Sequence, residues 1–191
     1  MASENRINID IFKAVTRAVA HSDDLDIMTN HLAQLLTTGL DIKGCAFFVL
    51  NAVTEELEIL ASFVLSAKYL TKGPLSAPKS IRETFQGEPV VVADVSLKHK
   101  SLQYPDEARK EGIAAIVSLP IIHLTEVIGV CRLYHYEPWK VSDQDLESLR
   151  ILTDIIGLAM TYTRFRNTVH AIAEILGQTF QVELTPKLGK R

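Results

Sequence analysis

The sequence predicts an α+β fold, in which helices near both ends of the chain accompany a set of antiparallel strands. Two runs of apolar residues at helical spacing open the chain, and a much longer one follows residue 142. Between them lie two pairs of short runs rich in aromatic and β-branched residues, each pair joined by a short polar stretch as in a β-hairpin. A length of 191 residues suits one domain with extensions.

Composition narrows the functional classes. Hydrophobic residues make up 47% and charged residues 23% of the chain, which is typical of a protein that buries a core. The net charge of −3 creates no field that attracts nucleic acid or an anionic membrane, so we expect neither as a partner. No apolar run approaches the ~18 residues of a membrane span, and the polar start is no signal peptide. We therefore expect a cytoplasmic protein.

The first elements are two amphipathic helices, over residues 9–20 and 24–38. Their apolar residues recur at helical spacing: Ile11, Phe12, Val15, Val19, Leu25, Met28, Leu32 and Leu35. We expect Ser22 or Asp23 to cap the second helix at its start, and Gly39 to take the left-handed position at its end.

The strands follow as two hairpins and one short piece. Residues 45–50 and 57–64 form the first hairpin, residues 90–92 a short strand, and residues 114–122 and 126–136 the second hairpin. This makes about five strands. Pro120 cannot donate to a β-ladder, which predicts a sheet edge or a bulge at that point.

Residues 65–113 contain short pieces between these strands. A helix is expected from Pro78 to Phe85, closed by Gly87, and Asp94 then opens a loop. A second short helix begins at Pro105, and Gly112 stops it.

The last helix begins after Ser142, which with Asp145 forms a variant capping box, and runs to about Gly177. At about 1.5 Å per residue it is roughly 50 Å long. One apolar stripe follows the a/d spacing of a coiled coil: Ile151, Ile155, Leu158, Tyr162, Phe165, Val169, Ile172 and Leu176. A second stripe covers only the first half: Leu149, Leu152, Ile156 and Ala159.

The first half of this helix has two apolar faces and the second half has one. This pattern predicts that the helix packs on its own sheet and then leaves the domain to pair with a second copy. The first stripe, which we name the α-helical seam, would then be a homodimer interface. In the alternative, the seam packs on the N-terminal helices of the same chain.

The order of these elements, together with GEPVVVADV (87–95), EGIAAIVSLPII (111–122), VIGVCRL (127–133) and SDQDLESLRILTDIIGLAM (142–160), resembles the GAF domain family over roughly residues 20–165. The resemblance implies a PAS-like central antiparallel sheet of five or six strands, with terminal helices on one face and a small-molecule pocket on the other. It divides the chain into an N-terminal helix (1–22), the GAF-like domain (23–162), a helical dimerisation extension (163–178) and a flexible tail (179–191).

Three specialised GAF types are disfavoured. The stretch LYHYEPWKVSDQD (133–145) lacks the Asn-Lys and Asp-Glu pairs of cyclic-nucleotide binders. Residues 65–113 hold His99 but no cysteine for a covalent bilin, and the only cysteines, Cys45 and Cys131, fall in predicted strands rather than in the pocket loops of free methionine sulfoxide reductases.

No catalytic residues are predicted. The chain has no nucleophile elbow, Walker loop or HExxH motif, and its six histidines lack metal-ligand spacing, so we expect no metal site. Cys45 and Cys131 lie on strands that would be neighbours in a GAF sheet, which leaves a redox pair open. Buried cysteines are more often small hydrophobic side chains.

Alternation along the last strand predicts the ligand-binding residues. Gly129, Cys131 and Leu133 face one side, where small residues let the helices approach, while Ile128, Val130, Arg132 and Tyr134 face the pocket. An arginine in an apolar strand needs solvent, a carboxylate or a bound anion. The predicted ligand-binding set is Phe48, Asp94, Tyr104, Val117, Arg132 and Tyr134. In the alternative, Asp94 caps its own loop and Arg132 pairs with a surface acid.

The resulting hypothesis is a non-enzymatic sensory or regulatory domain. It binds a small molecule, whose identity and any cofactor the sequence does not name, and signals through its dimeric helix to an output domain or partner protein. Two alternatives stay open. One is an interaction module whose pocket is filled by Phe48, Phe63, Tyr69 and Tyr104, and the other is a cysteine-based redox enzyme of the free methionine sulfoxide reductase type.

Overall fold

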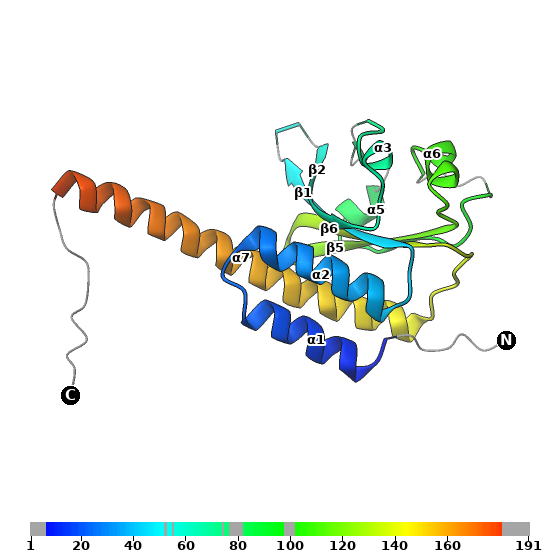
Figure 1. The fold of residues 1–191 in the computed structure, drawn as a ribbon, viewed down its shortest axis with the longest axis horizontal. Helices are drawn as coiled ribbons and strands as arrows, with labels where there is room; N and C mark the ends of the chain where they lie inside the picture. The colour runs from blue at the N-terminus through cyan, green and yellow to red at the C-terminus, as the bar shows by residue number, and fades with distance from the viewer. Residues whose placement is uncertain are drawn as a thin grey trace.

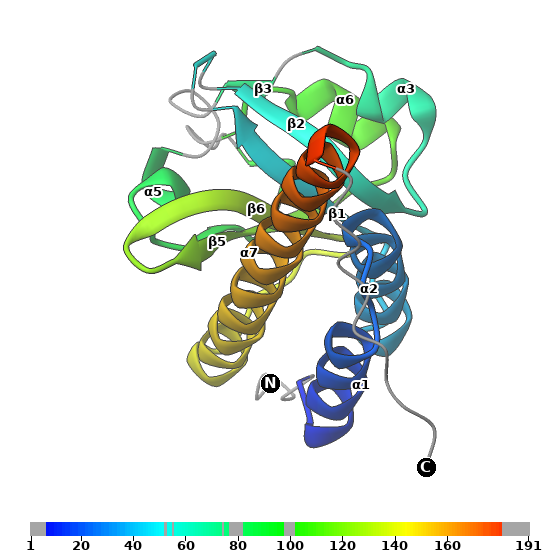
Figure 2. The ribbon, with the colours of Figure 1, turned by 90° about the vertical axis from the view of Figure 1, so that its left-hand side faces the viewer.

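The computed structural model describes residues 7–51, 53–54, 56–73, 75–76, 82–97 and 102–180. The described residues form three layers around a six-stranded sheet with the strand order β3-β2-β1-β6-β5-β4, in which all pairs are antiparallel. Two long helices cover one face of the sheet, a third packs against those two, and short helices lie on the other face (Figures 1 and 2). The predicted α+β fold with five or six strands is confirmed.

Helices α1 (Ile9–Ala20) and α2 (Leu25–Gly39) form as the periodicity predicts. The residues predicted at the two ends of α2 were each wrong by one or two positions. Asp24, rather than Ser22 or Asp23, caps α2 by accepting a hydrogen bond from the Ile27 amide at 2.9 Å. Gly39 is still helical, and the left-handed residue is Asp41, with φ of 51°, because aspartate tolerates this conformation.

Two hairpins build the centre of the sheet. Strands β1 (Gly44–Asn51) and β2 (Glu56–Phe63) form one, β5 (Ala115–His123) and β6 (Glu126–His135) form the other, and β1 pairs with β6 to join them.

The outer strands are short. Strand β4 (Val90–Val92) pairs with β5 at one edge, and β3 (Leu75–Ser76), too short to be predicted, pairs with β2 at the other. The β4 pairing stops at Ser118, two residues before Pro120, and the β5–β6 register shifts after Ile121. Pro120 therefore lies where the missing amide disturbs the ladder least, as predicted.

The short helices on the second face are α3 (Ala67–Leu70), α5 (Arg82–Phe85) and α6 (Pro105–Lys110). Helix α6 matches its prediction, and Gly112 follows it with φ of 77°. Of the helix predicted over residues 78–85, only Arg82–Phe85 is described, and residues 78–81 lie outside the described residues.

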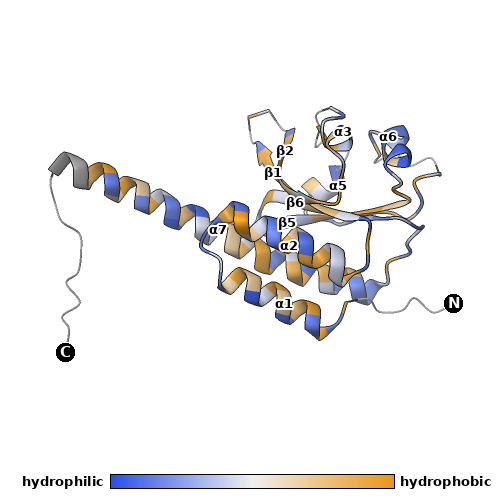
Figure 3. Cartoon of the chain, in the orientation of Figure 1, coloured by the Kyte–Doolittle hydropathy of each residue, from blue (hydrophilic) through white to orange (hydrophobic). Residues whose placement is uncertain are grey.

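Helix α7 (Asp143–Phe180) is the longest element, with 38 residues. The Ser142 hydroxyl accepts a hydrogen bond from the Asp145 amide at 3.0 Å, as the predicted cap requires. The buried Asp145 carboxylate accepts a second bond, from the Ile7 amide at 3.1 Å, and so joins the start of α7 to the residues before α1. The first half of α7 lies on the sheet, and the second half projects beyond it with apolar residues still recurring along it (Figures 1 and 3).

Two glycines mark the closest backbone approaches. A Cβ on Gly157 would lie 2.4 Å from the Ile122 carbonyl oxygen, so this glycine is what lets α7 lie on β5. Gly129 was expected to make room for the helices, and this was wrong. A Cβ there would lie 2.3 Å from the Phe48 carbonyl oxygen, so Gly129 instead admits the irregular backbone of β1.

Replacing Gly157 by alanine should therefore destabilise the domain. We expect the free energy of unfolding of Gly157→Ala to fall by about 1–3 kcal/mol in urea titrations, because α7 must move away from β5. The matched control is Gly39→Ala, also helical, whose new Cβ would lie 3.6 Å from Ile11 Cγ1, an ordinary contact. Alanine favours helix, so this variant should be neutral or up to about 1 kcal/mol more stable. Equal stability of the two variants would contradict the close approach.

Candidate functional site

A group of polar side chains lies on the sheet face opposite the long helices. Along β6, Val130 and Tyr134 pack on this face, whereas Cys131 and Leu133 belong to the helix-side core, as alternation predicts. Ile128 is the exception: it packs against the helix-side core. The pairing passes from Ile121–Gly129 directly to Ile122–Val127, so Ile128 is an inserted residue and the alternation reverses there.

Arg132 is the charged residue of this group. Its side chain is almost fully buried, at 3% exposure. Its Nε donates a hydrogen bond at 3.1 Å to the hydroxyl of Ser118, the residue opposite it on β5. The guanidinium carbon lies 6.0 Å from the centre of the Phe48 ring, at the outer limit of a cation–π contact.

A second cation, Lys72, approaches the same face from the segment after α3. Its Nζ donates a hydrogen bond to the Tyr69 carbonyl oxygen at 2.9 Å and lies 3.7 Å from the centre of the Tyr69 ring. The Tyr69 ring in turn meets the Tyr134 ring edge-on, with centroids 5.7 Å apart. We name these residues the Arg132 cluster: Phe48, Tyr69, Lys72, Ser118, Arg132 and Tyr134.

The electrostatics of the cluster follow from burial and positive charge. Burial, and then repulsion from Arg132, lower the pKa of Lys72 to about 8, although Glu107 and Glu111 act in the opposite direction. Burial raises the pKa of Tyr134 to about 12 and that of Tyr69 further, while the Arg132 charge opposes both shifts. Both phenols thus stay neutral near pH 7 and can donate hydrogen bonds.

The Tyr134 hydroxyl is fully buried and has no hydrogen-bond partner of normal geometry. The charge and the side-chain contact of Arg132 act to lower the pKa of Tyr134, against the larger effect of burial. A buried hydroxyl without a partner costs roughly 1–3 kcal/mol, and native proteins contain few of them.

The structure brings together three of the six predicted ligand-site residues, Phe48, Arg132 and Tyr134. Tyr104 lies at the edge of the cluster, half-buried, with its ring centre 5.9 Å from Lys72 Nζ. The predicted places of the other two were wrong. Val117 packs in the helix-side core because it lies opposite Leu133, and Asp94 caps its own loop by accepting the Ser96 amide at 2.8 Å.

Sequence reasoning missed Lys72 and Ser118, whereas Tyr69 was expected only as a side chain that fills the pocket of an interaction module. Ser118 is a lone hydroxyl in an apolar strand, a signal that could have been used. Lys72 lies in an irregular segment, where no periodicity indicates direction.

A cleft between α3 and α6 reaches one residue of the cluster, Tyr69. It has a volume of about 120 Å³ and is lined by Lys68, Tyr69, Glu107, Lys110 and Glu111. Glu111 joins the two helices, because its carboxylate accepts hydrogen bonds from the Ser66 amide at 2.7 Å and the Ser66 hydroxyl at 2.5 Å. Burial acts to raise the pKa of Glu111, but these two bonds, together with the charges of Lys43 and Lys72, lower it overall.

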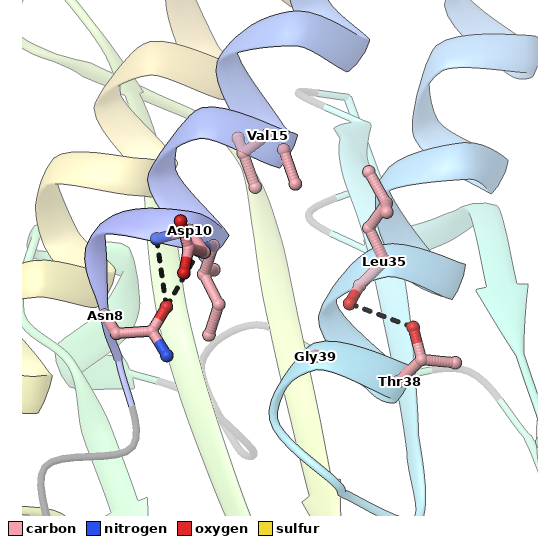
Figure 4. Close-up of a pocket in the computed structure, with 8 residues that line it drawn as sticks. Asn8, Asp10, Val15, Leu35, Thr38 and Gly39 are labelled. Carbon is pink, nitrogen blue, oxygen red and sulfur yellow. Dashed lines mark hydrogen bonds between the residues drawn. The ribbon is translucent and has the colours of Figure 1, made fainter.

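A larger groove of about 260 Å³ lies between α1 and α2 (Figure 4). Its polar groups serve the helices themselves: Asn8 Oδ1 accepts the Asp10 and Ile11 amides, and the Thr38 hydroxyl donates to the Leu35 carbonyl oxygen. The exposed Asp10 pairs with Lys13 at 3.1 Å. No buried charge lines this groove, which makes it a weaker candidate than the Arg132 cluster.

The two cysteines lie on the other side of the sheet from the cluster. Their Sγ atoms are 3.9 Å apart, and both side chains are buried in the helix-side core. Burial, with the neighbouring Cys131, raises the pKa of Cys45 well above its usual range. Because the thiolate is the reactive form, this site does not support thiol chemistry. Within the described residues, no group of His, Cys, Asp or Glu could hold a metal ion.

The α-helical seam is exposed along the projecting half of α7. Leu158, Tyr162 and Phe165 are each about two-thirds exposed, at 64%, 65% and 67%. Ile151, Val169, Ile172 and Leu176 are also exposed, whereas Ile155 is half-buried. The second stripe is buried on the sheet side, as predicted: Leu149, Leu152, Ile156 and Ala159.

The N-terminal helices do not cover the seam. The turn before α2 meets α7 at Arg166, which donates a hydrogen bond to the Asp23 carbonyl oxygen and lies 3.8 Å from its carboxylate. The alternative in which these helices bury the seam is therefore wrong for the described residues. Nor is any helix among the described residues long and apolar enough to cross a membrane.

Comparisons with known proteins agree with this architecture. The family model described as GAF domain matches residues 24–160. The GAF domain of a phosphoenolpyruvate-protein phosphotransferase from Coxiella burnetii superposes with a TM-score of 0.73 at 18% identity, covering 86% of this chain and 97% of that one. No curated protein matches the chain.

Two further similar structures differ from each other in activity. One is a free methionine-R-sulfoxide reductase from Neisseria meningitidis in complex with its substrate, with a TM-score of 0.69 at 15% identity and coverage of 87% of this chain and 96% of that one. The other is a phycocyanobilin-bound GAF domain from a cyanobacterial phytochrome, with a TM-score of 0.67 at 16% identity and coverage of 86% and 98%. At these identities the likeness shows the fold alone.

The shifted pKa of Lys72 predicts a measurable pH dependence. Lysine in the unfolded chain keeps its proton to about pH 10.4, so between pH 8 and 10 the unfolded state binds more protons and the free energy of unfolding rises with pH. The free energy of unfolding of wild type, minus that of Lys72→Met, should therefore rise over this window by roughly 1–2 kcal/mol. This value is reduced for the partial exposure of Lys72.

The raised pKa values of Tyr69, Tyr134 and Cys45 act in the opposite direction at high pH, but they do so in both proteins and cancel in the difference. Urea titrations at several pH values measure it, and Lys68→Met, at an exposed lysine of α3, is the control. A wild type–Lys72→Met difference that stays constant with pH would contradict the burial of Lys72.

Proposed function

The chain belongs to the GAF domain family, and from this premise we propose that it is a non-enzymatic regulatory module. In this proposal a small molecule binds at the Arg132 cluster, and a homodimer formed along the α-helical seam passes the signal on through α7. The observation that carries the proposal is that α7 continues past the sheet with its apolar seam exposed. The residues of α7 that pack in the helix-side core end at Met160, and Thr163 is the last buried one among the described side chains.

In this proposal, α7 passes the signal to a signalling output domain or to a partner protein. Residues 163–178 act as the dimerisation extension of the domain over residues 23–162. A cytoplasmic location belongs to the same proposal and is supported by two cysteines that remain free thiols 3.9 Å apart.

The coupling rests on the position of β6. Arg132 faces the ligand side, and its neighbours Cys131 and Leu133 pack in the same core as Leu149 and Leu152 of α7. A ligand that displaces β6 thus acts on the surface on which α7 lies. Such a ligand changes the dimer only if it binds two arrangements with different affinity.

One alternative has an observation in its favour. Phe48 and Tyr69 are buried in the cluster, at 2% and 4% exposure, as a self-filled interaction module would require. Phe63, which that alternative also invoked, instead packs against the helix-side core. The redox-enzyme alternative loses support because the thiols lie across the sheet from the cluster.

The dimer is tested by charge in the seam. We expect the double variant Phe165→Glu and Val169→Glu to weaken self-association at least about 100-fold in sedimentation experiments, because each glutamate would bury a charge in the interface. The matched control, Asn167→Glu and Ala171→Glu, adds the same two charges at exposed positions outside the seam and should remain dimeric. A wild-type chain that sediments as a monomer would overturn the proposed dimer.

A further inference from the structure

Three groups of the Arg132 cluster can donate hydrogen bonds to a ligand: the Arg132 guanidinium, the Lys72 ammonium and the Tyr134 hydroxyl. The guanidinium of Arg132 and the ammonium of Lys72 have no acceptor atoms. The Tyr134 hydroxyl, fully buried and without a partner, is a donor available beside them. Two cations on one largely buried face repel each other, and an anion between them would remove that cost.

The nearby carboxylates make contacts of their own outside the Arg132 cluster. Glu111 is held by Ser66 through both of its oxygens, where it joins α3 to α6. Glu107 lines the cleft between α3 and α6 and, with Glu111, acts to raise the pKa of Lys72. Asp94, the acid that sequence reasoning placed here, caps its own loop instead.

We propose that the Arg132 cluster binds an oxyanion, a carboxylate or a phosphate group, of the regulatory small molecule. Arg132 and Lys72 supply the positive charge, and the Tyr134 hydroxyl donates a hydrogen bond to one anionic oxygen. This inference rests on the proposed function, since it names the chemical class of the ligand. The cleft between α3 and α6 reaches Tyr69, and the ring of Tyr69 touches that of Tyr134, so it gives the direction of entry.

The surroundings indicate what the oxyanion is attached to. Phe48, Ile116 and Val130 are buried on the same face and present apolar surface beside Arg132. An aromatic or aliphatic group next to the anionic one would contact them. We therefore choose benzoate and phenyl phosphate as probes, and benzamide, which has the shape of benzoate without its charge, as the neutral comparison.

Calorimetric titrations at constant ionic strength test the inference. Wild-type protein should bind benzoate or phenyl phosphate at least 10-fold more tightly than benzamide, and the better of the two anions distinguishes a carboxylate site from a phosphate site. Arg132→Met and Lys72→Met should each weaken binding of that anion at least 10-fold. Lys13→Met, at an exposed lysine of α1 on the opposite side of the sheet, should leave its affinity unchanged.

Tyr134→Phe keeps the test valid if the buried Arg132 variant fails to fold. It removes only the unpartnered hydroxyl, so its melting temperature should equal or exceed that of wild type while its affinity for the anion falls several-fold. A purely structural hydroxyl would instead lower the melting temperature and leave affinity unchanged, and that result would overturn the inference.

Two other results would overturn it in distinguishable ways. Benzamide that binds as tightly as both anions would reject the oxyanion and leave the ligand-binding module standing. If none of the three probes binds, the oxyanion and the ligand half of the proposed function fail together, and the self-filled interaction module is favoured.

Discussion

The sheet is a single layer, so each side chain of β6 must belong to one of its two faces. Arg132 and Tyr134 lie with the cover formed by α3 and α6, and Cys131 and Leu133 lie with the long helices. Strand β6 is central, between β1 and β5, and both of its faces are buried. Because protein interiors are close-packed, a shift of this strand cannot be absorbed in empty space on either side. The site and the helices are therefore separated by only the thickness of one backbone.

In the proposed homodimer, helix α7 would connect this strand to a second copy of the chain. Its residues in the helix-side core end at Met160, and at Gly157 its backbone comes close enough to β5 that a side chain would not fit. From Gly157 to Leu176 the helix extends a further ~29 Å as one continuous element. A small tilt at the sheet would be enlarged at the far end by this lever. The exposed seam lies along this projecting half of α7, so a partner helix packed on it would move with it.

Sequence periodicity was sufficient for the long elements and insufficient for the site. Helices α1, α2 and α7 and both hairpins were predicted because each repeats a pattern over many residues. Val117 was assigned to the wrong face because its direction depends on the pairing of Ser118 with Arg132, which only the structure supplies. Ile128 was misplaced by a bulge that leaves no trace in the alternation. Lys72 belongs to an irregular segment, and its approach to Tyr69 depends on tertiary packing.

The central claim is that occupancy of one face of the sheet alters the helices on the other. Spin labels on Ala171→Cys in both protomers would report the distance between the projecting helices, and the buried Cys45 and Cys131 would stay unlabelled. The account predicts that the distribution of label-to-label distances changes when the anionic probe that binds the Arg132 cluster is added. An unchanged distribution at saturating probe would contradict it.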